Sequence, residues 1–219
     1  MKTDAAFWLV LVGSVAQAVL LLIGLLGLAR YRQLPQGLRY LVGLIWFGVA
    51  LELASTLLHF WKIPNLLLLP LDAAGELWLL AAVYAWALQS AAFTRLWPWV
   101  AGGFAAYAAL SSGLAPELAR FKPGVLVLEC LLVLGLVGLY FRKLLNELRV
   151  QSLADDPMFW VSTGLLLYSL AKLQIALFSN YMLAHYSMQL NQLMWAINAF
   201  MSIVLYLCYC RALWMRPQK

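Results

Sequence analysis

Seven long apolar runs make up most of this sequence, and a short break with proline or charged residues separates each run from the next. A run of about 20 apolar residues crosses the hydrocarbon core of a bilayer as an α-helix. Proline and charge end such helices because neither continues readily into hydrocarbon. The pattern predicts an all-α polytopic membrane protein, a seven-transmembrane helix bundle that forms one domain over residues 1–219. The expected spans cover about 5–29, 40–60, 66–90, 96–114, 124–141, 158–181 and 188–213.

Composition supports lipid as the solvent of this chain. Hydrophobic residues make up 65% of it and charged residues 11%, whereas a soluble domain is roughly half apolar and about a quarter charged. The 219 residues hold seven spans with short loops and leave no room for a soluble catalytic domain. The first apolar run, 7–29, is too long for the core of a signal peptide, so we expect it to remain as the first span.

The distribution of lysine and arginine predicts the orientation. Breaks on one side of the predicted bundle hold ten of these residues: Arg30, Arg32, Arg39, Arg95, Arg142, Lys143, Arg149, Arg211, Arg216 and Lys219. Breaks on the other side hold four: Lys2, Lys62, Arg120 and Lys122. Because cytoplasmic loops carry the excess of positive charge, we expect the N-terminus outside and the C-terminus in the cytoplasm, in a bacterial inner membrane. The net charge of +6 then reflects topology and anionic lipid, and nucleic acid is not an expected partner.

The longest break on the cytoplasmic side, Arg142–Asp156, is the predicted contact surface for a cytoplasmic signalling protein, together with the tail Arg211–Lys219. The run Asp155-Asp156-Pro157 is typical of a helix start, with aspartate as the N-cap and proline in the first turn of the sixth helix. A shorter corner, Arg95–Pro98, combines charge with proline and is expected to separate the third helix from the fourth.

Ionisable and polar side chains also occur inside the predicted spans, where an ionisable group costs about 2.5 to 3.5 kcal/mol on insertion. Residues three, four and seven apart lie on one side of a helix, so Glu52, Ser55 and His59 share a face, as do Asp72 and Glu76. In the predicted topology most of these polar groups fall in the outer half of the membrane. If their faces point into the bundle, they line a cavity that opens outward. The predicted ligand-binding residues are Glu52, Ser55, His59, Asp72, Glu76, Glu129, Lys172, Asn191 and Trp195.

The charges of the predicted site residues narrow the prediction to particular kinds of ligand. Four carboxyl groups stand against the single base Lys172, which leaves three negative charges if every group is ionised. Hydrocarbon does not tolerate that excess, so protonation, a cation, a cationic ligand or penetrating water must compensate it. A purely structural network is the alternative, because polar contacts between helices also stabilise membrane bundles, by about 0.6 kcal/mol each on average.

The run from Ser55 to His59 has the form SxxxH, and Asp72 and Glu76 follow on the next helix. This combination resembles the zinc-dependent seven-helix hydrolases of the alkaline ceramidase and adiponectin-receptor superfamily. The resemblance implies that His59 is a zinc ligand, supported by Ser55, with Asp72 or Glu76 as acid or base. That family completes its zinc site with HxxxH on the seventh helix, where this chain has no histidine; His185 lies in the preceding loop. One imidazole cannot hold zinc alone, so carboxylates of other helices would have to substitute.

A second resemblance covers nearly the whole chain. Features such as Glu52, Glu76, the Asp156–Trp160 entry to the sixth helix and Trp195-Ala-Ile-Asn198 resemble small bacterial seven-helix membrane proteins that occur alone or as sensor modules. None of these features is a motif with an assigned chemistry, so the resemblance implies a location, a topology and a sensory role. Retinal proteins share the seven-helix plan but need a lysine on the seventh helix, which this chain lacks.

The leading hypothesis is a receptor-like or sensory membrane module that binds a small ligand or cation and signals to a cytoplasmic or membrane partner. A zinc-dependent intramembrane lipid hydrolase is the alternative, and zinc is expected only under that reading. A small proton- or cation-coupled transporter is a second alternative, since intramembrane acids paired with a lysine can relay protons. The sequence favours a role that is not enzymatic, and no catalytic residue is predicted.

Overall fold

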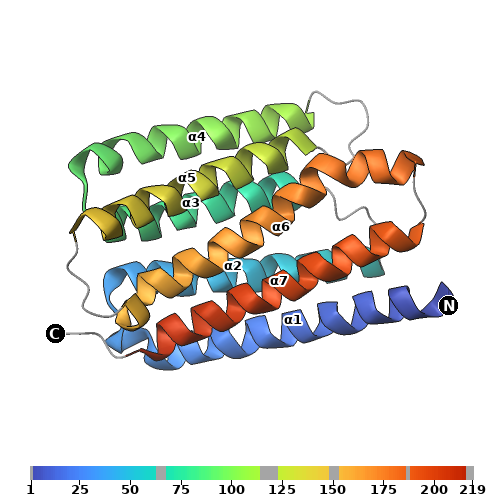
Figure 1. Cartoon of the computed structure of the whole chain (residues 1–219), viewed down its shortest axis with the longest axis horizontal. Coiled ribbons are helices and arrows are strands. Elements are labelled where there is room, and N and C mark those ends of the chain that lie inside the picture. Colours follow the sequence, from blue (N-terminus) through green and yellow to red (C-terminus); the bar gives the residue numbers. More distant parts are fainter. Residues whose placement is uncertain (1, 63–67, 114–122, 148–152, 186–187, 216–219) are drawn as a thin grey trace.

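The computed structural model describes the backbone of residues 2–62, 68–113, 123–147, 153–185 and 188–215 (Figure 1). Side chains are described there except those of residues 2–9, 59, 112–113, 147, 178–185 and 188–192. The long helices are α1 (Lys2–Arg30), α2 (Gln36–Phe60), α3 (Leu69–Leu88), α4 (Ala91–Gly113), α5 (Pro123–Glu147), α6 (Pro157–His185) and α7 (Met188–Trp214). Two short 3-10 turns, η1 (Tyr31–Gln33) and η3 (Leu153–Asp155), precede α2 and α6. No strand occurs in the described ranges, so the all-helical prediction is confirmed.

Six of the helices form a closed ring. Helix α1 packs against α2, α2 against α3, α3 against α5, α5 against α6, α6 against α7, and α7 returns to α1. Helix α4 packs on α3 from outside this ring and touches α5 only slightly, and it forms the upper edge of the bundle in Figure 1. Successive helices run in opposite directions, so the N-terminus and the C-terminus lie at opposite ends of the bundle (Figure 1).

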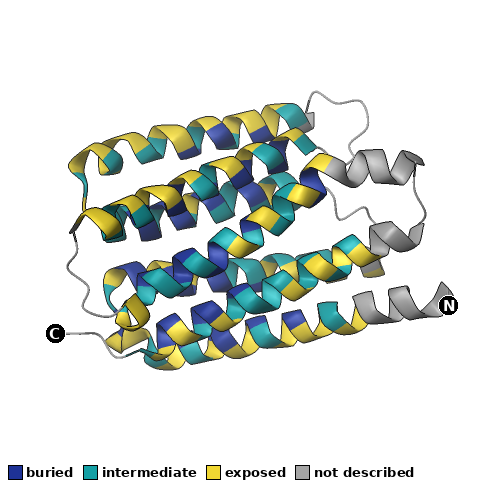
Figure 2. Cartoon of the chain, viewed as in Figure 1, coloured by how far each residue is buried: buried dark blue, intermediate teal, exposed yellow. Residues whose placement is uncertain are grey.

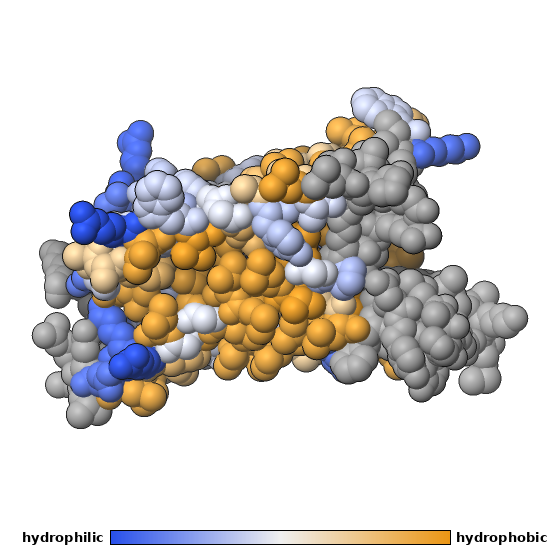
Figure 3. All heavy atoms as spheres, turned by 90° about the horizontal axis from the view of Figure 1, so that it is seen from above, coloured by the Kyte–Doolittle hydropathy of each residue, from blue (hydrophilic) through white to orange (hydrophobic). Residues whose placement is uncertain are grey.

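The chain is a helical membrane protein by the length and hydropathy of its helices. Within the described ranges, six stretches are long and apolar enough to cross a bilayer: Val10–Gln33, Gln36–Leu58, Leu69–Leu88, Pro123–Asn146, Pro157–Leu177 and Leu193–Trp214. Exposed residues cover the outer faces of the helices (Figure 2). Apolar residues occupy the middle of the surface in the view of Figure 3. Helix α4, which contains Arg95 and Pro98, is not among these six stretches.

The prediction that Arg95–Pro98 separates the third helix from the fourth is wrong. Helix α4 begins at Ala91 and runs through Pro98. The turn consists of Gln89, in the left-handed region at φ 49°, and Ser90, whose Oγ accepts a hydrogen bond from the Phe93 amide at 3.4 Å. Ser90 therefore caps α4 one turn before the charged corner. Proline at the eighth helical position removes one backbone hydrogen bond, and the helix continues through it.

Basic residues satisfy the carbonyl groups left unpaired where helices end. Lys143 of α5 donates from Nζ to the carbonyl oxygens of Ala87 and Leu88, both at 2.9 Å, at the end of α3. Arg30 of α1 donates to the Leu213 carbonyl at 3.3 Å, and its guanidinium lies 4.7 Å from the ring centroid of Trp214 at the end of α7. Cations at a helix C-terminus also favour the helix dipole. These contacts tie α1 to α7 and α3 to α5 at one end of the bundle.

The predicted start of the sixth helix is confirmed. The Asp156 Oδ1 accepts a hydrogen bond from the Met158 amide at 2.9 Å, as an N-cap does, and α6 begins at Pro157. The other carboxylate oxygen of Asp156 accepts a hydrogen bond from the Tyr140 hydroxyl of α5. Asp156 therefore starts one helix and fastens it to another.

Buried apolar side chains from all seven long helices form the core. They include Leu38 and Val42 in α2, Leu80 in α3 and Leu165 in α6. Helices α6 and α7 come close at Gly164, where a Cβ atom would lie 2.9 Å from the Cβ of Cys208.

Candidate ligand-binding cavity

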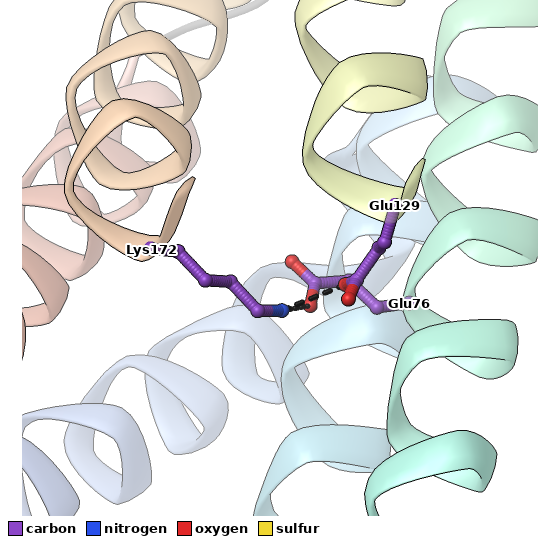
Figure 4. Close-up of polar contacts among 3 residues, drawn as sticks. All are labelled: Glu76, Glu129 and Lys172. Atoms are coloured by element: carbon purple, nitrogen blue, oxygen red, sulfur yellow. Dashed lines mark hydrogen bonds and ion pairs between the residues drawn. The ribbon is translucent and has the colours of Figure 1, made fainter. Parts of the chain in front are cut away.

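One lysine and two glutamates from three helices meet inside the bundle. The Lys172 Nζ of α6 lies 2.7 Å from Oε1 of Glu129 on α5 and 3.0 Å from Oε2 of Glu76 on α3. Figure 4 shows the lysine reaching across to both carboxylates, which approach it from neighbouring helices. We call Lys172, Glu76 and Glu129 the triad. Because α3, α5 and α6 are adjacent in the ring, this contact joins three of its walls.

The triad is shielded from solvent and carries an excess of acid. Glu129 is 1% exposed, and the Lys172 and Glu76 side chains are 13% and 16% exposed. The second carboxylate oxygen of Glu129, Oε2, is buried and has no hydrogen-bond partner among the described residues. One ammonium group stands against two carboxylates, so the triad carries one excess negative charge if every group is ionised. Removing a partner from such a buried ion pair is costly.

A cavity of about 640 Å³ lies next to the triad, inside the ring. Its polar wall consists of Glu52 and Ser55 from α2 and Asp72 and Glu76 from α3. Its aromatic wall consists of Phe47, Tyr168, Trp195, Tyr206 and Tyr209. Glu76 belongs to both the cavity wall and the triad, so the two features are connected through one carboxylate. The volume falls within the range of small-molecule sites, about 300 to 1,000 Å³.

Two cavity carboxylates differ in their surroundings. The Oε2 of Glu52 accepts a hydrogen bond from Nε2 of Gln17 on α1, at 3.0 Å. Asp72 is half-buried and makes no hydrogen bond or ion pair of its own to another described residue. Gln17 contributes a dipole but no charge. Neither Glu52 nor Asp72 therefore has a basic partner in the described part of the chain.

The structure brings most of the predicted site residues together. Glu52, Ser55, Asp72, Glu76 and Trp195 line the cavity. Lys172 and Glu129 do not line the cavity. They are connected to it because Lys172 pairs with both Glu129 and the cavity-lining Glu76. The side chains of His59 and Asn191 lie outside the described residues, so their predicted roles stay predictions.

Sequence reasoning missed Gln17 and the tyrosines of the cavity. A signal for Gln17 existed, since it is an amide inside an otherwise apolar run. Tyr168 lies one turn before Lys172, on the same face of α6, and its ring centroid is 5.7 Å from Nζ of the lysine. Tyr206 and Tyr209 lie three residues apart on α7.

The SxxxH run resembles part of a zinc site, so the described side chains around it bear on metal binding. Among the described side chains, no group of three or more histidine, cysteine, aspartate or glutamate residues gathers closely enough to hold a metal ion. His59, the predicted ligand under that reading, is not among those side chains. The hypothesis of a zinc-dependent hydrolase therefore stays untested.

No protein-family model, curated protein or solved structure matches this chain. Neither family resemblance in the sequence is tested by a relative, and both stay predictions. The cavity, its charges and its position in the helical ring are the features that bear on function.

Proposed function

We propose that this protein is a receptor-like, seven-span module of the bacterial inner membrane that binds a small ligand in the cavity and signals to a partner protein. One observation carries the proposal: a cavity of about 640 Å³ inside the ring is lined by three carboxylic acids and Ser55. The cavity opens to the surface of the bundle, so a ligand can enter it from outside. Acids placed around an internal space are typical of a binding site in a membrane protein.

The position of the cavity supports a signalling role. Its walls come from α1, α2, α3, α6 and α7, so a ligand contacts five helices at once. The same helices continue into the packed core and then to the end of the bundle where Lys143 and Arg30 join neighbouring helices. A ligand that binds one arrangement of these helices more tightly than another shifts the protein toward that arrangement. Because the helices run the length of the bundle, the shift changes their positions at both ends of it. The sequence predicted a loop at 142–156 and a tail at 211–219, but α5 continues to Glu147 and α7 to Trp214. We propose that the partner contacts these helix ends together with the chain between α5 and α6 and the C-terminal residues.

Ligand binding is tested with two matched glycine substitutions on α2. Gly48 lines the cavity, and a Cβ there would meet only Leu20 Cδ2 at 3.8 Å, so Gly48→Phe should fill the cavity without breaking the fold. Gly43 is exposed on the same helix and has nothing within 4 Å, so Gly43→Phe is the control. In a thermal-shift screen of metabolite extracts fractionated by charge, stabilising fractions should act on the parent and on Gly43→Phe but not on Gly48→Phe. Fractions that stabilise all three proteins equally, or none, would contradict a ligand site here.

The seven-span topology has its own test, centred on α4. If α4 crosses the membrane and the N-terminus is outside, the Gln89–Ser90 turn is cytoplasmic and the loop at 114–122 is external. A membrane-impermeant maleimide added to intact cells should then label Glu117→Cys and leave Gln89→Cys unlabelled, with full labelling of both after lysis. The parent chain, whose Cys130 and Cys208 are buried, sets the background. Labelling of Gln89→Cys alone in intact cells would overturn the orientation, and equal labelling of both would overturn the α4 span.

A further inference from the structure

The charges around the cavity favour a positively charged ligand. Lys172 is fully engaged by Glu76 and Glu129, at 3.0 and 2.7 Å. Glu52 and Asp72 face the same space, and neither has a basic partner among the described residues. An anionic ligand would add to this excess, and a neutral ligand would leave it in place. A cation removes it, because opposite charges attract.

The aromatic wall favours an organic cation over a metal ion. Five aromatic rings line the cavity, and the faces of aromatic rings attract ammonium groups. Leucine and isoleucine side chains make up most of the remaining wall and suit a ligand with a carbon body. Calcium instead requires six to eight oxygen ligands, and magnesium a near-octahedral set. Glu52 and Asp72 belong to no such cluster among the described residues.

We propose that the cavity selects small organic ammonium ions, with Glu52 and Asp72 as the charge partners and the rings of Tyr168, Trp195 and Tyr206 around the cationic group. This inference rests on the proposed function and names its ligand class. Glu76 links binding to the triad, because it lines the cavity and also pairs with Lys172. An ammonium that approaches Glu76 competes with Lys172 for this carboxylate. Lys172 keeps Glu129, whose buried Oε2 is free to accept a second hydrogen bond.

The test compares ammonium ions with neutral molecules of the same shape. Purified full-length protein in detergent is titrated with tetramethylammonium, tetraethylammonium, choline and putrescine, and with 3,3-dimethylbutan-1-ol, the neutral isostere of choline. At least one ammonium should raise the melting temperature and bind by calorimetry, and the neutral isostere, sodium chloride and magnesium chloride should not. Lack of binding by every ammonium in the panel, or equal binding of choline and its isostere, would overturn the inference.

Substitutions assign the effect to named groups. Glu52→Gln and Asp72→Asn should each weaken binding of the best ammonium on the order of tenfold, the loss expected for about 1.4 kcal/mol. Asp155→Asn removes an exposed acid outside the cavity and should leave the affinity unchanged. Trp195→Leu should weaken binding several-fold through loss of its ring, whereas Trp99→Leu, at a position 80% exposed on α4, should not. Unchanged affinity in Glu52→Gln, Asp72→Asn and Trp195→Leu would place the ammonium elsewhere and refute the assignment.

These outcomes separate the ligand class from the proposed function. If neutral or anionic compounds stabilise the parent but not Gly48→Phe, the cavity is a ligand site and the ammonium inference alone fails. If no compound of any charge distinguishes the parent from Gly48→Phe, both fail.

Discussion

Replacing Lys172 with methionine is expected to destabilise the folded protein by about 3 to 5 kcal/mol, the cost of removing one partner from a buried ion pair. Methionine keeps the length and apolar stem of lysine but leaves Glu76 and Glu129 facing each other without a base. Glu129 is 1% exposed, so water cannot replace the lost ammonium group at that carboxylate. The measurement is thermal and denaturant unfolding of purified protein in detergent micelles, followed by circular dichroism.

Three further variants isolate the charge effect. Lys62→Met removes an exposed lysine at the end of α2 and should change the unfolding free energy by no more than about 0.5 kcal/mol. Glu129→Gln should cost much less than Lys172→Met, because Lys172 keeps Glu76 and the amide oxygen still accepts a hydrogen bond. The triple variant Lys172→Met, Glu76→Gln, Glu129→Leu should recover most of the lost stability, since a network replaced as a whole leaves no isolated charge. A Lys172→Met protein as stable as the parent would show that the triad does not hold α3, α5 and α6 together.

Replacing Asp156 with alanine should destabilise the protein by about 2 to 3 kcal/mol, because two hydrogen bonds to one carboxylate disappear. One of them caps α6 through the Met158 amide, and the other comes from the Tyr140 hydroxyl of α5. The free energy of unfolding in detergent measures the loss. It should be accompanied by faster hydrogen exchange in the first turn of α6, where the cap is removed.

The neighbouring aspartate supplies the control for this prediction. Asp155 is exposed, and Asp155→Ala should stay within about 0.5 kcal/mol of the parent. Tyr140→Phe removes only the hydroxyl and should lose part of the stability that Asp156→Ala loses, since the N-cap remains. Equal stability of the Asp155→Ala and Asp156→Ala proteins would contradict the role assigned to Asp156.

Much of the fold could be predicted from local features. Long apolar runs predicted membrane helices, and the Asp156-Pro157 pair predicted where α6 begins, because capping depends on residues adjacent in the chain. The wrong boundary at Arg95–Pro98 arose from treating charge and proline as stronger signals than the Ser90 cap. The predicted end of the fifth span at 141 was also wrong, because α5 continues to Glu147. Pro98, at the eighth position of α4, removes one backbone hydrogen bond without ending the helix, and the Ser90 cap marks where α4 begins.

The candidate site could be predicted only in part. Spacing placed Glu52 with Ser55, and Asp72 with Glu76, on shared helix faces, and all four line the cavity. Spacing could not indicate that Gln17 of α1 reaches Glu52, because the two are 35 residues apart. It also could not select Glu76 and Glu129 as the partners of Lys172 from four acids of the same charge.

The sequence alone determined that the chain forms apolar helices suited to a bilayer, and which polar residues share a face of each helix. Both properties follow from hydropathy and from the 3.6-residue helical turn, which act within one segment. Only the tertiary structure decided how each helix is rotated and which helices are neighbours. That arrangement placed α4 outside the ring, joined Lys172 to two particular glutamates and left a cavity beside them. Rotation and neighbours depend on packing between side chains far apart in the chain, which no single helix encodes.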